Sequence, residues 1–139
     1  MDDPVRRRVL VVDDDASMRT LLTLVLEQLD CAVVAAADGP SALQAARADE
    51  LDLAIVDFRM PGMTGLDVAG VLRARAPQLP IVLVSGDVHA IDLAAAREVG
   101  VSRFLAKPFN LRDIQDCLRL TGTPAGVAGA GGERIEENR

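Results

Sequence analysis

Polar side chains follow four apolar runs of this sequence, at points where buried strands would give way to loops. Asp57 is the most informative of them, because it ends the run Leu53–Val56 and precedes the loop 58–62. Other polar residues stand in the same position: Asp13-Asp14-Asp15 after residues 9–12, Ser85 after 81–84 and Lys107 after 104–106. If the strands are parallel, these acids, the hydroxyl and the ammonium gather at one edge of the sheet. Such a group of side chains suits a divalent cation and a phosphoryl group.

The acids Asp13, Asp14 and Asp57 are candidate metal ligands. Carboxylates that converge raise one another's pKa values, and a bound cation removes this repulsion. A ligand set made only of oxygens favours a hard ion, Mg²⁺ foremost and Mn²⁺ second. The alternative for the run 13–15 is a helix N-cap, which we expect for Asp15, whereas Asp13 and Asp14 can serve both roles.

Lys107 is the only lysine of the chain, and every other basic residue is an arginine. A lysine at a strand end can pair with a carboxylate or a phosphate as a compact charge. Its bond to Pro108 is a candidate for the cis form. The hydroxyl of Ser85 suits a contact to a phosphoryl oxygen, but a serine before Gly86 is equally typical of a turn.

Length and composition restrict the class of protein. The 139 residues indicate one domain, and half of them are apolar, which is enough for a core. The net charge of −6 argues against direct nucleic-acid binding by this segment. We expect Cys31 and Cys117 to pack in the core. Neither an apolar signal region near Met1 nor an apolar run long enough for a bilayer is present, so no membrane contact and a cytoplasmic location are expected.

Along the chain, apolar runs alternate with stretches in which apolar residues recur at helical spacing. We expect strands at 9–12, 32–37, 53–56, 81–84 and 104–106. Helices are expected around 18–29, from 38–40 onward, at 65–75, at 89–99 with Gly100 after it, and after Asn110 with Leu111, Ile114, Cys117 and Leu118 facing inward. This alternation predicts an α/β fold, a doubly wound parallel sheet of five strands with helices on both faces.

The composition also predicts the domain boundaries. We expect a short N-terminal extension at 1–6, one folded domain at 7–120 and a flexible tail at 121–139, which is rich in Gly, Ala, Thr and Pro before a charged end.

Taken together, these motifs resemble the receiver domain of bacterial two-component response regulators, above all the single-domain chemotaxis regulators. The resemblance rests on Val-Val-Asp-Asp at 11–14, Asp57 with Met60-Pro61-Gly62-Met63-Thr64-Gly65, Ser85-Gly86 and Lys107-Pro108-Phe109. It covers about residues 7–120. It implies a flavodoxin-like fold with the strand order 2-1-3-4-5, for which a chemotaxis member of this family is the standard example.

The resemblance also implies a role for each matching residue. Asp57 corresponds to the phosphoacceptor, and the Mg²⁺ ligands correspond to Asp13, Asp14, Asp57 and the backbone carbonyl of Arg59. Ser85 corresponds to the hydroxyl that contacts the phosphoryl group, and Lys107 to the lysine that pairs with it. Phe104 corresponds to an aromatic switch position that is often tyrosine, although plain core packing is nearly as good an interpretation.

The implied function is a signalling switch in a phosphorelay, not an enzyme. The donor would be a sensor histidine kinase or a histidine phosphotransfer protein, and the output a changed affinity for a downstream protein or a second copy. The contact surface would be formed by the fourth helix, the fifth strand and the fifth helix. We expect the side chains of Arg59 and Asp87 to tune water access and His89 to be a surface residue.

Other functions remain as alternatives. The chain can be a receiver fragment of a longer transcriptional regulator. A metal-dependent aspartyl-phosphate phosphatase is less favoured, because Arg59 stands where such an enzyme has a second acid. A flavin-binding module is disfavoured by the lack of Trp and Tyr, and a receiver that only binds partners is disfavoured because all the signature positions are filled.

Overall fold

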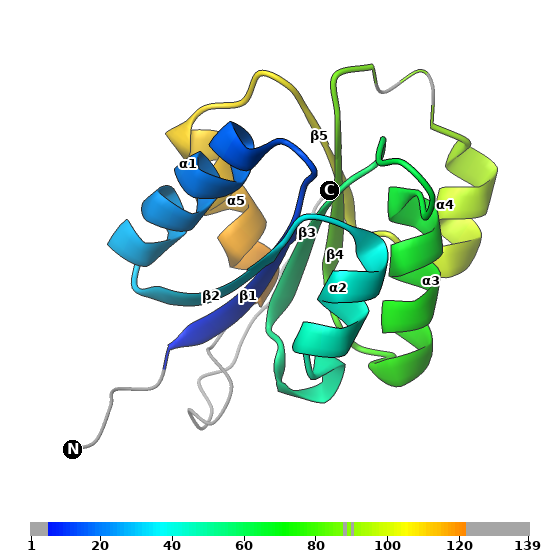
Figure 1. Cartoon of the computed structure of the whole chain (residues 1–139), viewed down its shortest axis with the longest axis horizontal. Helices are drawn as coiled ribbons and strands as arrows, with labels where there is room; N and C mark the ends of the chain where they lie inside the picture. Colours follow the sequence, from blue (N-terminus) through cyan, green and yellow to red (C-terminus); the bar gives the residue numbers. More distant parts are fainter. Residues whose placement is uncertain (1–5, 88, 90, 122–139) are drawn as a thin grey trace.

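A computed structural model describes residues 6–87, 89 and 91–121. Five parallel strands form one sheet in the order β2-β1-β3-β4-β5, which confirms the predicted fold class and strand order (Figure 1). The strands are β1 (Arg7–Val12), β2 (Cys31–Ala36), β3 (Leu53–Asp57), β4 (Ile81–Ser85) and β5 (Arg103–Ala106).

Helices cover both faces of the sheet. Helices α1 (Ala16–Gln28) and α5 (Leu111–Leu118) lie on one face, and α2 (Gly39–Ala45), α3 (Gly65–Arg75) and α4 (Leu93–Val99) lie on the other (Figure 1). The short 3₁₀ turns η1 (Ala48–Glu50) and η3 (Arg119–Thr121) follow α2 and α5. The sheet is therefore the middle one of three layers, which explains why its central strands are apolar on both sides.

Alternation along each central strand divides the core in two. In β1, Leu10 and Val12 pack under the helices α2, α3 and α4, whereas Val9 and Val11 pack under α1 and α5. The strands β3 and β4 alternate in the same way, and all their residues are buried. Cys31 and Cys117 lie buried as free thiols in the core under α1 and α5, as expected. Burial raises the pKa of the Cys117 thiol to about 11, so it packs as a neutral side chain.

Side-chain caps fix where the helices begin. Asp15 caps α1 by accepting from the backbone N–H of Ser17 and Met18, as predicted. Capping boxes begin α3, at Thr64 with Asp67, and α5, at Asn110 with Asp113.

Two expectations about the last helices were wrong. Helix α4 begins at Leu93 and not at 89, because the side chain of Asp92 caps it by accepting from the N–H of Ala95. Leu111 is 53% exposed and does not face inward. It is the first residue of α5, and side chains lean toward a helix's N-terminus, so this one projects beyond the end of the helix.

The two ends of the described domain are joined. Arg7 Nε donates to Thr121 Oγ1 at 2.7 Å, which links the start of β1 to the turn η3. Residues 1–5 and 122–139, which contain most of the expected extension and tail, lie outside the described residues, so the boundaries stay a prediction.

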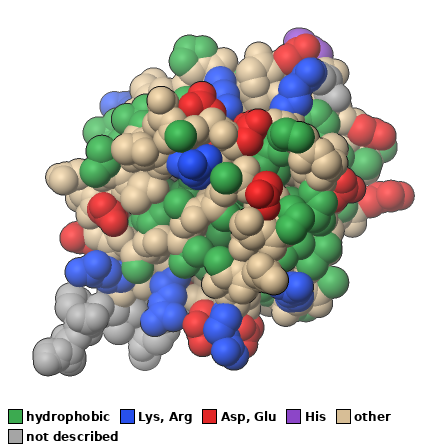
Figure 2. Space-filling view, viewed as in Figure 1, with side chains coloured by type: hydrophobic (Ala, Val, Ile, Leu, Met, Phe, Trp, Pro, Cys, Tyr) green, Lys and Arg blue, Asp and Glu red, His purple; other side chains and the backbone are tan. Residues whose placement is uncertain are grey.

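The surface carries mixed charges. On the face shown in Figure 2, acidic and basic side chains are interspersed among apolar ones. Within the described residues, none of the helices has the length and apolar character that a membrane span requires.

Candidate functional site

The strand register brings the predicted site residues to one edge of the sheet. Val12 pairs with Val56, so Asp13 and Asp57 are neighbours at the carboxyl ends of β1 and β3. On the other side, Ser85 pairs with Ala106, which places Lys107 just beyond the end of β5. Residues that are far apart in the sequence thus meet because parallel strands end at the same edge.

Asp13, Asp57 and Ser85 are the buried polar or charged residues of the described part of the chain. They are 2%, 6% and 2% exposed, respectively. Burying a carboxylate is costly unless it is paired or binds a cation. The carboxylates of Asp13 and Asp57 therefore need a positively charged partner at this edge of the sheet.

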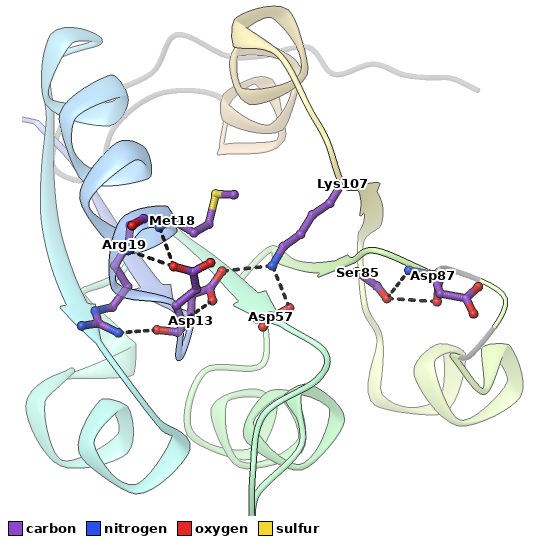
Figure 3. Close-up of polar contacts among 9 residues, drawn as sticks. Asp13, Met18, Arg19, Asp57, Ser85, Asp87 and Lys107 are labelled. Carbon is purple, nitrogen blue, oxygen red and sulfur yellow. Dashed lines mark hydrogen bonds and ion pairs between the residues drawn. The ribbon is translucent and has the colours of Figure 1, made fainter.

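Lys107 bridges the two buried acids (Figure 3). Its Nζ lies 3.3 Å from Asp13 Oδ2 and 3.4 Å from Asp57 Oδ1. The long lysine side chain crosses the end of β4 to reach them, since β4 lies between β3 and β5. The Lys107–Pro108 peptide bond is cis, as the sequence suggested.

Burial and neighbouring charges shift the pKa values of Asp57 and Lys107. Burial, and after it the charge of Asp13, raises the pKa of Asp57 from an ordinary value of 3.8 to about 6, although the attraction of Lys107 opposes this. Burial alone would lower the pKa of Lys107, but the carboxylates of Asp57 and Asp13 outweigh it and raise that pKa. The lysine is therefore charged at neutral pH, and the acids are only partly compensated.

The acids are arranged as ligands of a divalent cation. Oxygen atoms of Asp13, Asp14 and Asp57 all lie within 4.8 Å of one another. Three carboxylates and one ammonium leave an excess of two negative charges, which a divalent ion would neutralise. A site with oxygen ligands and no thiolate or imidazole fits Mg²⁺.

Comparison with known proteins identifies the family and the fold. Residues 9–119 match the family described as the response regulator receiver domain. The chain belongs to this family. The receiver domain is 41% identical over 114 residues to the DNA-binding response regulator MtrA of Mycobacterium tuberculosis, and the match covers 81% of this chain and 49% of MtrA. It is 32% identical over 110 residues to the alkaline phosphatase synthesis transcriptional regulatory protein PhoP of Bacillus subtilis, with 79% and 46% covered.

The chain thus spans about half the length of these curated relatives. Solved structures match it almost over their full length. The chemotaxis protein CheY4 of Vibrio cholerae superposes with a TM-score of 0.76 and 30% identity, over 82% of this chain and 97% of CheY4. The response regulator TrrA of Thermotoga maritima, solved in complex with Mg²⁺-BeF, superposes with a TM-score of 0.74 and 29% identity, over 83% and 98%.

Ser85 of this receiver domain is turned away from Asp57 and toward its own loop (Figure 3). Its Oγ donates to the carbonyl of Asp87 and accepts from the N–H of the same residue, both at 3.0 Å. The turn that sequence reasoning left open is therefore present. His89 is exposed, as expected, and its N–H donates to Asp87 Oδ1 at 3.0 Å.

The remaining predicted positions are Arg59 and Phe104. Arg59 is exposed in the loop after Asp57, and its carbonyl stays a predicted ligand. Phe104, on β5, is half-buried and packs against the core under α3 and α4. This position serves both interpretations of Phe104, as core packing and as a ring able to change its exposure.

Sequence reasoning missed two residues that shape the site. Arg19 Nη1 donates to the backbone carbonyl of Asp13 at 2.8 Å. Gly65 begins α3 against β3, and a Cβ added there would lie 2.5 Å from the carbonyl oxygen of Asp57 and 2.8 Å from Cα of Phe58. The Gly65 signal was present in the family motif, whereas nothing in the spacing marks Arg19 among fourteen arginines.

Proposed function

We propose that this receiver domain is a phosphoacceptor switch in which Asp57 takes a phosphoryl group from a phosphohistidine. The observation that carries the proposal is the bridge from Lys107 to the buried carboxylates of Asp57 and Asp13, at 3.4 and 3.3 Å. The donor is a sensor histidine kinase or a histidine phosphotransfer protein, in the cytoplasm.

The transfer is a substitution at phosphorus. A carboxylate oxygen of Asp57 forms a bond to phosphorus, the P–N bond to the donor imidazole breaks, and the imidazole retains the electron pair and takes a proton. Mg²⁺, when held by Asp13, Asp14, Asp57 and the carbonyl of Arg59, would offset negative charge on the phosphoryl oxygens. Lys107 is already placed to pair with a phosphoryl group on Asp57, since its ammonium lies beside the acceptor oxygen.

Phosphorylation changes the contacts of Ser85 and Lys107. A phosphoryl group brings about two negative charges and strong acceptor oxygens. For the Ser85 hydroxyl to donate to it, the bond to the Asp87 carbonyl has to break, and the start of the β4–α4 loop is released. A movement of this loop would bias the surface formed by α4, β5 and α5, including the ring of Phe104.

The test is incubation with acetyl phosphate and Mg²⁺. We expect a single phosphoryl group per chain, stable in acid and labile in base, and its loss in the Asp57→Asn variant. Continued turnover of many equivalents of a phosphate ester would instead support a phosphatase. A chain that stays unmodified at saturating Mg²⁺ would remove the proposal.

The second candidate is a receiver that forms one half of a longer DNA-binding regulator. It is favoured by the curated relatives, whose names describe DNA-binding or transcriptional regulators twice as long as the matched region. The phosphoacceptor chemistry is the same in both cases, and only the output differs. Determining the reading frame downstream of Arg139 separates the two.

A further inference from the structure

Arg19 is a cation that lies beside the acidic site, and the proposed phosphoryl transfer gives it no role. It lies near the start of α1, is half-buried, and donates from Nη1 to the backbone carbonyl of Asp13 at 2.8 Å. Figure 3 shows Arg19 and Lys107 approaching Asp13 from opposite sides. Lys107 pairs with the carboxylate of Asp13, whereas Arg19 holds its main chain.

The contact lies at the peptide group that joins Asp13 to Asp14. The other atoms of Asp13 are held from elsewhere: its N–H donates to Ala36 at 3.1 Å, and its Oδ1 accepts from the N–H of Asp15 at 2.9 Å. A peptide group is planar, so a bond to its carbonyl also restricts the direction in which Cα of Asp14 leaves it. Arg19 therefore restricts the positions of both carboxylates, including that of Asp14, which is exposed to solvent.

We propose that Arg19 is a positioning residue for the metal site. By fixing the peptide between Asp13 and Asp14, it holds both carboxylates where, with Asp57, they bind a divalent cation. The inference rests on the proposed function, because it assigns the residue that supports the Mg²⁺ ligands of that same site.

The charge of Arg19 and its hydrogen bond to Asp13 have opposite effects on the binding of a divalent cation. A cation near a cation site repels the incoming ion, whereas a hydrogen bond that orients ligands favours binding. The guanidinium is partly exposed to solvent, which weakens the repulsion, while the 2.8 Å bond acts directly on the ligand-bearing peptide. We therefore expect the loss of Arg19 to weaken Mg²⁺ binding, and the sign of the change separates positioning from simple charge repulsion.

The experiment is calorimetric titration of the metal-free protein with Mg²⁺ alone. The change of Arg19→Met is expected to raise the Kd for Mg²⁺ about 10-fold, within the range typical of residues that orient metal ligands. Arg19→Lys is expected to raise it less, about 3-fold, because an ammonium can still donate to the carbonyl. This partial rescue is a readout that loss of helix packing would not produce.

Arg75→Met is the matched control. Arg75 also donates from Nη1 to a backbone carbonyl at 2.8 Å, that of Leu43, but it lies in the last turn of α3. That turn is about 15 Å along the helix from Gly65, which contacts the site. We expect its Kd to equal that of the unchanged protein, and circular dichroism checks that each variant is folded.

Each result decides between the two claims. If the unchanged protein does not bind Mg²⁺, the proposed function fails and the inference fails with it. If it binds Mg²⁺ but Arg19→Met binds equally well or more tightly, only the inference is overturned. An equal loss of Mg²⁺ affinity in Arg75→Met would also overturn the inference. If Arg19→Met does not fold, Arg19→Lys decides, and an unchanged Kd in that variant would overturn the inference.

Discussion

Asp57 makes the folded receiver domain less stable than it would be with a neutral residue at this position. Its carboxyl group has a pKa of about 6 in the fold against an ordinary value of 3.8, because it is buried beside Asp13. A carboxyl group whose pKa is higher in the folded chain holds its proton more readily there. The folded state therefore loses relative stability as the pH rises from about 4 to above 6, and this cost remains at neutral pH.

The variant Asp57→Asn should therefore be more stable than the unchanged protein at neutral pH. The pKa difference sets an upper limit of about 3 kcal/mol, and we expect about 1–2 kcal/mol because Lys107 loses one partner. At about pH 4 the gain should largely vanish, since the carboxyl group is then protonated in the folded chain. Urea unfolding at both pH values measures this, with the exposed Asp49→Asn as control. A gain of equal size at both pH values would contradict the assignment of the cost to ionisation.

Lys107 should control the proton affinity of Asp57. Its ammonium attracts the carboxylate and so lowers the pKa of Asp57, against burial and Asp13. The variant Lys107→Met keeps an unbranched side chain of nearly the same length but removes the charge, and it should move that pKa above 6. A ¹³C NMR titration of the aspartate carboxyl groups measures it. Lys107→Arg should stay near the unchanged value, and an unmoved pKa in Lys107→Met would mean that Lys107 does not interact with Asp57 in solution.

At the scale of elements, the site depends on how closely α3 approaches the end of β3. The N–H of Gly65 donates at 2.9 Å to the carbonyl of Phe58, the residue that follows Asp57 at the end of β3. A side chain at this position would overlap main-chain atoms, which cannot rotate away as a flexible side chain can. The glycine is therefore part of the positioning of Asp57.

We expect Gly65→Ala to destabilise the domain by about 1–3 kcal/mol and to slow the labelling of Asp57 by acetyl phosphate. Gly70 is the control within the same helix, because a Cβ added there meets no atom within 4 Å. Gly70→Ala should stabilise the domain by up to about 1 kcal/mol, since alanine is the better helix former, and should leave labelling unchanged. Thermal unfolding and a labelling time course measure both, and equal behaviour of the two variants would refute the close-approach argument.

Elements that are buried on both faces could be predicted well from the sequence. Residues 9–12 of β1, 53–56 of β3 and 81–84 of β4 are continuous apolar runs, and the polar residues that follow them predicted which side chains of β1 and β3 meet. The start of α4 could not be predicted, because an alanine-rich pattern fits many helix starts and the cap at Asp92 decides among them. The contacts of Arg19 and Ser85 could not be predicted either, since a hydrogen bond to a main-chain carbonyl leaves no periodic signal.

At the scale of the whole molecule, large apolar side chains remain exposed on helices that cover both faces of the sheet. Leu93 on α4 and Leu111 on α5 are 52% and 53% exposed, and Leu21 and Leu24 on α1 are 51% and 55% exposed. Figure 1 shows α1 and α5 on one face of the sheet and α4 on the other, so a surface that joins α4 to α5 runs around the edge strand β5. Only the first pair belongs to the surface through which we propose that phosphorylation acts.

The double variant Leu93→Gln and Leu111→Gln should therefore separate the output from the chemistry. We expect labelling of Asp57 by acetyl phosphate to stay unchanged, and stability to change by no more than about 0.5 kcal/mol per exposed site. Association of phosphorylated copies, measured by sedimentation velocity, should be lost, because removing apolar contact area weakens the binding of a second copy through this surface. The matched variant Leu21→Gln and Leu24→Gln removes the same number of exposed leucines from α1 and should associate normally. If the α1 variant loses association while the α4 and α5 variant keeps it, the proposed output surface is wrong, although the phosphoacceptor site would stand.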